Sequence, residues 1–203
     1  MLLAREATVP KRWNIAPHDP TTVASLEKSA GISPILARLL AARGVTDPKQ
    51  VRGFLDASMA NLREPEELFG IAEAADSILA AAKAGRKIVI YGDYDADGMS
   101  STAILCHCLK AIHVEPHWYV PDRFDEGYGL NSDALRRLKQ DGAELVVTVD
   151  CGIASVAEAD VAREIGLELI ITDHHNFADR LPAADVLVHP RLPGSEYPFG
   201  DLC

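Results

Sequence analysis

The chain has 203 residues, of which 48% are hydrophobic and 25% are charged, and its formal net charge at pH 7 is −10. This length suits one sizeable core with a small accessory domain. No run of about 18 apolar residues occurs, and the segment from Met1 to Trp13 lacks the apolar core of a signal peptide, so the sequence excludes a transmembrane helix and favours a cytoplasmic protein.

The negative charge is unevenly distributed. Residues 1–60 hold eight Lys and Arg against five Asp and Glu, whereas the remainder holds twelve against twenty-five. Phosphate groups are bound mainly by Lys and Arg, so an acidic chain that binds nucleic acid needs a local basic groove or one supplied by further chain. Bound metal ions would also reverse the local field.

Residues 1–66 are predicted to form a small helical domain. Ser33-Pro34 begins an apolar-periodic stretch that ends at Arg43-Gly44, and Asp47-Pro48 begins a second one. A cation in the last turn with Gly just beyond it is typical of a helix end, so short helices are expected here.

Residues 67–203 alternate between helical and strand patterns. Helices are expected at about 71–84, 99–112, 131–141 and 154–165, and strands at 87–91, 116–120, 145–149, 168–172 and 185–188. This alternation predicts an α/β domain with βαβ crossovers and a mostly parallel sheet. Trp118 lies in the second strand and is predicted to be in the core, and the Pro-rich segment 190–198 is predicted to be a connector.

Acidic turns follow three of these strands directly. They are Asp93 to Gly98, Asp150 to Gly152, and the triplet Asp173-His174-His175. Open α/β sheets bind ligands at strand carboxyl ends, so we expect these side chains to meet. Carboxylates and imidazoles suit Mn²⁺ or another divalent hydrolytic metal, and two ions about 3.5 to 4 Å apart would polarise a phosphoryl group and activate water.

Two other metal sites are disfavoured. Asp93, Asp95 and Asp97 match the opening of an EF-hand loop, but its twelfth position is Ile104 rather than Glu and a strand precedes it. Cys106-His107-Cys108 lies in an expected helix, where adjacent residues point to different sides, so reduced thiols are favoured over zinc. An ordinary solvated turn explains one acidic segment but not three.

The three turns carry a family resemblance. Gly92 to Gly98, Asp150-Cys151-Gly152, and Thr172 to His175 resemble motifs I, II and III of the DHH phosphoesterase superfamily. Arg123 with Glu126 to Asn131, and Tyr197-Pro198-Phe199, resemble its branch of single-stranded-DNA exonucleases. The resemblance covers nearly the whole chain and implies a Rossmann-like five-stranded sheet, incomplete at its C-terminus, preceded by a helical domain.

The resemblance also implies metal ligands. Asp95 and Asp97 would bind separate ions, Asp150 would bridge them, and His174 would hold the second ion. Many superfamily members carry His at the position of Tyr91, so one ion would rely on Asp93 or water instead, and Asp93 is either a ligand or the partner of one. The family's fourth motif, with a further Asp, would lie beyond Cys203, so weak metal binding is expected.

Further residues are expected to act on the substrate or to support the site. His175 would orient or protonate phosphate oxygens, and Asp173 would fix an imidazole tautomer. Arg123 would contact a phosphate and Tyr128 a base, with Asn131 beside them; the alternative is a Gly-rich turn anchored by a core Tyr. The backbone at Gly98 and Gly152 would approach metal or phosphate closely.

Two assignments stay open. His189 is either a residue of the site or an exposed loop residue. Four N-terminal cations either contact DNA phosphates or are only solvated: Arg38, Arg43, Lys49 and Arg52.

The residues alone predict metal-dependent phosphoester hydrolysis. The resemblance implies more: an exonuclease that uses Mn²⁺ or Mg²⁺ to release mononucleotides from single-stranded DNA in the 5′-to-3′ direction, in repair and recombination, with a single-strand-binding protein and a helicase as partners. Alternatives are a phosphodiesterase acting on oligoribonucleotides or cyclic dinucleotides, and a nucleic-acid-binding fragment without catalysis.

Overall fold

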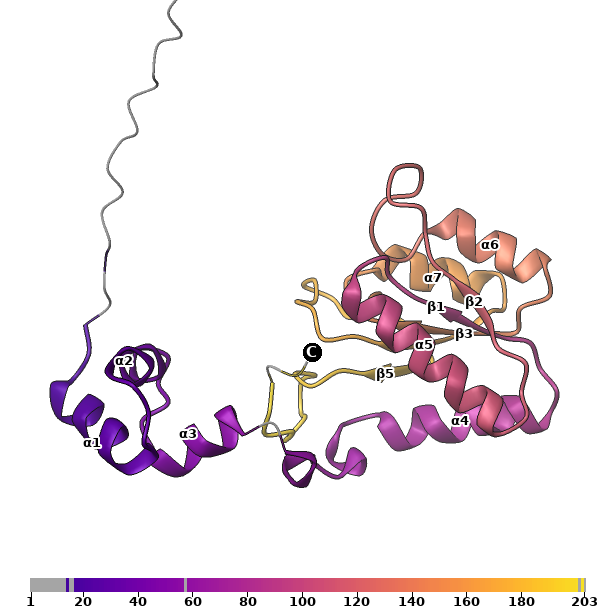
Figure 1. Cartoon of the computed structure of the whole chain (residues 1–203). Helices are drawn as coiled ribbons and strands as arrows, with labels where there is room; N and C mark the ends of the chain where they lie inside the picture. Colours follow the sequence, from indigo (N-terminus) through magenta and orange to yellow (C-terminus); the bar gives the residue numbers. More distant parts are fainter. Residues whose placement is uncertain (1–13, 15–16, 57, 201, 203) are drawn as a thin grey trace, which may run out of the picture. The chain divides into compact units, whose positions relative to one another are not determined.

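The computed structural model describes residues 14, 17–56, 58–200 and 202, and the chain divides into two compact units (Figure 1). The units are Met1–Arg63 and Glu64–Cys203. The division falls near residue 66, where the sequence pattern changes from short helices to alternating helices and strands.

The first unit contains the helices α1 (Pro20–Ala30), α2 (Pro34–Ala42) and α3 (Pro48–Leu55), and the 3₁₀ turn η1 (Met59–Asn61). Each α-helix starts with Pro after a residue whose side chain caps it: Asp19, Ser33 and Asp47. The predicted helix starts at Ser33 and Asp47 are therefore confirmed. The helices share a small core of five buried residues, Val23, Leu26, Ala37, Leu40 and Val51.

The second unit begins with the turn η2 (Pro65–Glu67) and contains, among the described residues, a five-stranded parallel sheet in the order β2-β1-β3-β4-β5. The strands are β1 (Ile88–Tyr91), β2 (His117–Tyr119), β3 (Leu145–Val149), β4 (Glu168–Thr172) and β5 (Val186–Val188). The helices are α4 (Ile71–Lys83), α5 (Ala96–Ala111), α6 (Ser132–Gln140) and α7 (Val156–Glu164). The predicted α/β class and parallel sheet are confirmed.

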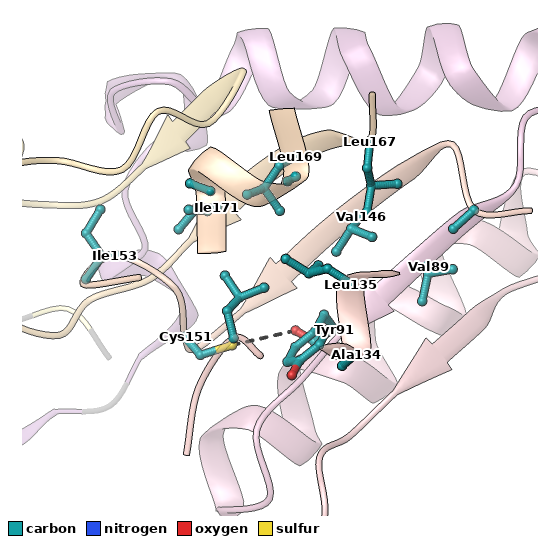
Figure 2. Packing of buried hydrophobic residues seen from close by; sticks show 14 of the residues in the cluster. Val89, Tyr91, Ala134, Leu135, Val146, Cys151, Ile153, Leu167, Leu169 and Ile171 are labelled. Atoms are coloured by element: carbon teal, nitrogen blue, oxygen red, sulfur yellow. Dashed lines mark hydrogen bonds between the residues drawn. The ribbon is translucent and has the colours of Figure 1, made fainter. Parts of the chain in front are cut away.

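Helices cover both faces of the sheet (Figure 1). Residues of α4 and α5 pack on one face with Ile88 and Ile90, and residues of α6 and α7 pack on the other with Val89 and Tyr91. Figure 2 shows the second cluster, where Tyr91 lies beside Cys151, whose Sγ donates to the Tyr91 carbonyl at 3.8 Å. The sheet is therefore buried on both sides, as its near-continuous apolar strands require.

The prediction that Trp118 lies in the core is wrong. Its side chain is 64% exposed. The reason is that β2 is an edge strand of three residues, and its burial is much lower than that of the central strands.

Over the described ranges, none of the helices combines the length and the apolar character that crossing a membrane would need.

The register of the sheet aligns the strand ends that carry the acidic turns. Tyr91 pairs with Thr148, and Val149 pairs with Thr172. The segments that follow β1, β3 and β4 therefore leave the sheet side by side at one edge.

Gly98 is required by close packing at the first of these turns. A Cβ there would lie 2.6 Å from three atoms of Asp93, two of them backbone. Although Ala forms helices better than Gly, we expect Gly98→Ala to destabilise the second unit by roughly 1 to 3 kcal/mol, because the backbone of Asp93 would have to move. Thermal unfolding measures this change.

Gly53→Ala in α3 is the control for Gly98→Ala, because a Cβ at Gly53 meets nothing within 4 Å. It should leave stability unchanged or raise it by up to about 1 kcal/mol. Equal melting of Gly98→Ala and the wild type would contradict the close packing.

Candidate metal centre

Three neighbouring strand ends supply the candidate ligands. Asp93 and Asp95 follow β1, Asp150 follows β3, and His174 and His175 follow β4. Asp95 also starts α5, because its Oδ1 accepts hydrogen bonds from the N–H groups of Asp97 and Gly98 at 2.9 and 3.0 Å. The helix begins at Ala96 for this reason, slightly before the expected residue 99.

The side chains form two groups that share Asp150. One consists of Asp93, Asp95 and Asp150, and the other of Asp150, His174 and His175. Within each group the possible ligand atoms lie within 4.8 Å of one another. The first group consists of three carboxylates and the second of one carboxylate and two imidazoles. Together they form a donor set that suits a divalent hydrolytic metal rather than structural zinc.

Asp150 is held in an unusual conformation at the centre. Its φ of 62° is left-handed, which is uncommon for a residue other than Gly. Its side chain is buried, and His174 Nε2 lies 2.9 Å from its Oδ1. Burial, and then the negative charge of Asp95, raise the pKa of Asp150 to about 6. A positive group near Asp150 would relieve this cost.

Two buried oxygens at the centre have no hydrogen-bond partner among the described residues, Asp93 Oδ2 and Asp150 Oδ2. Asp93 is fully buried, and burial is the main cause that raises its pKa. Buried polar atoms are normally paired, and buried charges are paired or coordinate a metal. The unpartnered oxygens therefore fit one or more bound cations.

Asp173 is committed to hydrogen bonds within the chain. Its Oδ1 accepts from the N–H groups of His174 and His175 and lies 2.8 Å from His175 Nδ1, while its Oδ2 accepts from the Ile153 N–H at 2.9 Å. Although burial acts to raise it, the pKa of Asp173 is lowered by these backbone N–H groups and by His175. Asp173 therefore orients His175 and belongs to neither ligand group.

Asp97 and the two glycines border the centre. Asp97 is exposed in the first turn of α5 and lies outside both groups, but it lines a cavity of about 150 Å³ together with Asp150 and His174. Gly152 has φ of +108°, and a Cβ there would lie 2.8 Å from Leu130 Cδ1. The turn after β3 consequently depends on Gly152.

The segment between β2 and α6 contacts the centre through Tyr128, and its Arg123 contacts the neighbouring Tyr94. The Arg123 guanidinium carbon lies 5.3 Å from the centroid of the Tyr94 ring, and Tyr128 Oη lies 3.4 Å from each ring nitrogen of His175. Tyr128 is 56% exposed, which rules out the alternative of a core Tyr. Asn131 does not reach the centre: its Oδ1 caps α6 by accepting from the N–H groups of Asp133 and Ala134.

Sequence reasoning missed two supporting residues and left one open. Arg191 donates to the His174 carbonyl at 2.9 Å, and Tyr94 packs edge-on against Tyr128 with ring centroids 6.3 Å apart. His189 is buried rather than exposed, and its Nε2 lies 2.8 Å from the His175 carbonyl. The only sequence signal for these three was proximity to motifs I and III.

Removing the charge of Asp150 should have opposite effects with and without metal. In EDTA, we expect Asp150→Asn to raise the melting temperature, because the carboxylate is buried beside Asp95 with one oxygen unpartnered. With Mn²⁺ added, the wild type should gain stability and Asp150→Asn should gain little. Thermal unfolding with and without Mn²⁺ tests both effects.

Asp179→Asn provides the matched control, because Asp179 is exposed and belongs to neither group. It should melt like the wild type in both buffers. If Mn²⁺ stabilised Asp150→Asn as much as the wild type, Asp150 would not be a ligand of the ion.

Comparisons with known proteins agree with this geometry. The chain is 46% identical over 191 residues to the single-stranded-DNA-specific exonuclease RecJ of Bacillus subtilis (strain 168), covering 94% of this chain and 24% of that protein. It is 36% identical over 174 residues to RecJ of Escherichia coli (strain K12), covering 85% and 30%. The chain thus spans about a quarter to a third of the length of these relatives.

A solved structure supports the same relationship. The crystal structure of RecJ in complex with Mn²⁺ from Thermus thermophilus matches with a TM-score of 0.64 and 31% identity, over 91% of this chain and 26% of that one. Residues 87–197 match the model of the DHH family, N-terminal domain. These residues are more than half of the chain, which therefore belongs to the DHH family.

Proposed function

We propose that this chain carries the metal-binding part of a phosphodiesterase that degrades single-stranded DNA from the 5′ end. The observation that carries the proposal is the pair of ligand groups joined at Asp150, with unpartnered buried oxygens on Asp93 and Asp150. Similarity to RecJ structures that contain Mn²⁺ or Mg²⁺ supports these ions as the cofactors, with two ions in the complete enzyme.

The ligand roles follow from the two groups. Asp93 and Asp95 would hold one ion, His174 the other, and Asp150 would contact both. Asp97 would become a ligand only if its exposed side chain turned toward the cavity that it lines. When bound, the ions would polarise the phosphodiester and activate water for attack.

His175 is the candidate for acting on the phosphate itself. Burial acts to lower its pKa, but the adjacent carboxylates, Asp173 above all, raise it overall. Because Asp173 holds Nδ1, His175 can present Nε2 and donate a hydrogen bond to a phosphate oxygen as negative charge develops. Here Asp173 acts as the positioning partner of the imidazole.

Arg123 and Tyr128 are the proposed substrate contacts. Arg123 offers a guanidinium that can contact a phosphate, and the exposed ring of Tyr128 beside His175 can stack on a base. This combination of a cation and an aromatic ring is what single-strand binding uses. In an acidic chain it would give the local positive charge that phosphate needs.

Several finer properties rest on similarity to RecJ. They are release of mononucleotides, 5′-to-3′ polarity, a role in repair and recombination in the cytoplasm, and work with a single-strand-binding protein and a helicase. The exposed N-terminal cations Arg38, Arg43 and Lys49 are candidates for additional DNA phosphate contacts.

The direct test uses 5′- and 3′-labelled single-stranded DNA with Mn²⁺, beside Asp95→Ala and Asp150→Ala. We expect mononucleotides to leave from the 5′ end, and each variant to lose about 100-fold or more in rate, because several kcal/mol of charge stabilisation would be lost.

Oligoribonucleotides and cyclic dinucleotides serve as competing substrates in the same assay. If either were hydrolysed faster than single-stranded DNA, it would be the preferred substrate in place of single-stranded DNA. Tight DNA binding without hydrolysis, unchanged in both variants, would instead identify a binding module.

A further inference from the structure

Two tyrosines on neighbouring strands point their hydroxyl groups at the same loop. Tyr91 at the end of β1 pairs in register with Tyr119 at the end of β2, and their ring centroids lie 5.1 Å apart. Both belong to the side of the sheet that packs against α6 and α7. The loop they contact is the segment from Pro121 to Leu130, which carries Arg123 and Tyr128.

Tyr91 holds the end of this loop from inside the core. Its side chain is fully buried (Figure 2), yet its hydroxyl donates to the Gly129 carbonyl at 3.1 Å. A buried hydroxyl that found no partner would cost free energy, so this hydrogen bond fixes where Gly129 lies. Tyr91 thus uses its polar atom on the loop, although it lies only two residues before Asp93.

Tyr119 holds the middle of the loop through Glu126. Its hydroxyl lies 2.5 and 2.6 Å from the two carboxylate oxygens of Glu126, to which it donates. The same carboxylate accepts from the Arg137 guanidinium of α6 and from the Asp122 N–H. Glu126 is therefore tied to β2, to α6 and to the start of its own loop.

Tyr128 lies between the two anchored residues. Its neighbours Glu126 and Gly129 are held by Tyr119 and Tyr91, while its own ring meets His175 and Tyr94 edge-on, with centroids 6.0 and 6.3 Å apart. Arg123, in the same loop, lies over Tyr94. The position of both proposed substrate contacts relative to the metal centre thus depends on two hydroxyl groups that belong to neither ligand group.

We propose that Tyr91 and Tyr119 are positioning residues for substrate binding, which place Tyr128 and Arg123 beside the metal centre by holding Glu126 and Gly129. This inference rests on the proposed function, because the contacts it positions are those proposed to bind single-stranded DNA. It assigns Tyr91 a role in holding the loop, at a position where many superfamily members carry His.

The test is steady-state hydrolysis of 5′-labelled single-stranded DNA by Tyr91→Phe and Tyr119→Phe, each of which removes one oxygen and keeps the ring. Tyr91→Phe should raise KM about 2- to 10-fold, the loss expected for one neutral hydrogen bond, and change kcat little. Tyr119→Phe should raise KM at least as much, because the hydrogen bond it loses goes to a carboxylate, and should also change kcat little. Stabilisation by Mn²⁺ alone, measured by thermal unfolding, should match the wild type, because neither hydroxyl lies in a ligand group.

A double-mutant cycle shows whether the tyrosines act through Tyr128. In a Tyr128→Ala background, Tyr91→Phe should raise KM by much less than it does alone. Arg137→Ala should raise KM. Arg136→Ala removes the same charge from the preceding residue of α6 and, among the described residues, breaks the ion pair with Asp133, so it should leave KM unchanged.

The outcomes separate the two proposals. If the wild type hydrolyses DNA and both Phe variants keep its KM, or if their effects add fully to Tyr128→Ala, the positioning role is overturned while the proposed function stands. If the wild type neither binds nor hydrolyses single-stranded DNA, the proposed function fails and the positioning role fails with it.

Discussion

The parallel pairing of β1, β3 and β4 is the constraint on which the candidate centre depends. In-register hydrogen bonds bring Tyr91, Thr148 and Thr172 to the same edge, so the residues just beyond them must converge. A shift of one residue between two strands would turn every side chain of the shifted strand to the opposite face of the sheet. Because both faces are buried, this shift would disrupt the packing and is disfavoured. Chain segments that are far apart in sequence, from Asp93 to His175, thereby supply the candidate ligands of one centre.

The centre contains energetically unfavourable features of backbone and side chain, which the surrounding structure holds in place. Asp150 has a left-handed φ, and it shares with Asp93 the burial of an unpartnered oxygen. Such strain persists only where the surroundings over-determine the conformation. Here the surroundings are the apolar clusters on the two faces of the sheet and the hydrogen bonds of Asp173 to the turns after β3 and β4. Local stability is therefore lower at the centre, where buried carboxylates lie close together.

The sequence predicted the helices and strands, and the convergence of the candidate side chains, better than the contacts between separate segments. Apolar runs such as Leu145–Val149 identify buried strands, and the acidic turns after them predicted which side chains would converge. Burial at an edge is not visible in such a pattern, so Trp118 was misplaced. Nor does a local pattern show that Asn131 would cap a helix, or that Tyr91 would reach Gly129, because both facts depend on how separate segments pack.

Asp150 is the residue that two cation sites are proposed to share, one with Asp93 and Asp95 and one with His174. A crystal structure of the chain grown with Mn²⁺, with anomalous scattering recorded at the manganese edge, tests this sharing most directly. We expect anomalous peaks in contact with Asp150, one beside Asp93 and Asp95 and the other beside His174. Peaks confined to other acidic side chains, with none touching Asp150, would contradict a shared ligand.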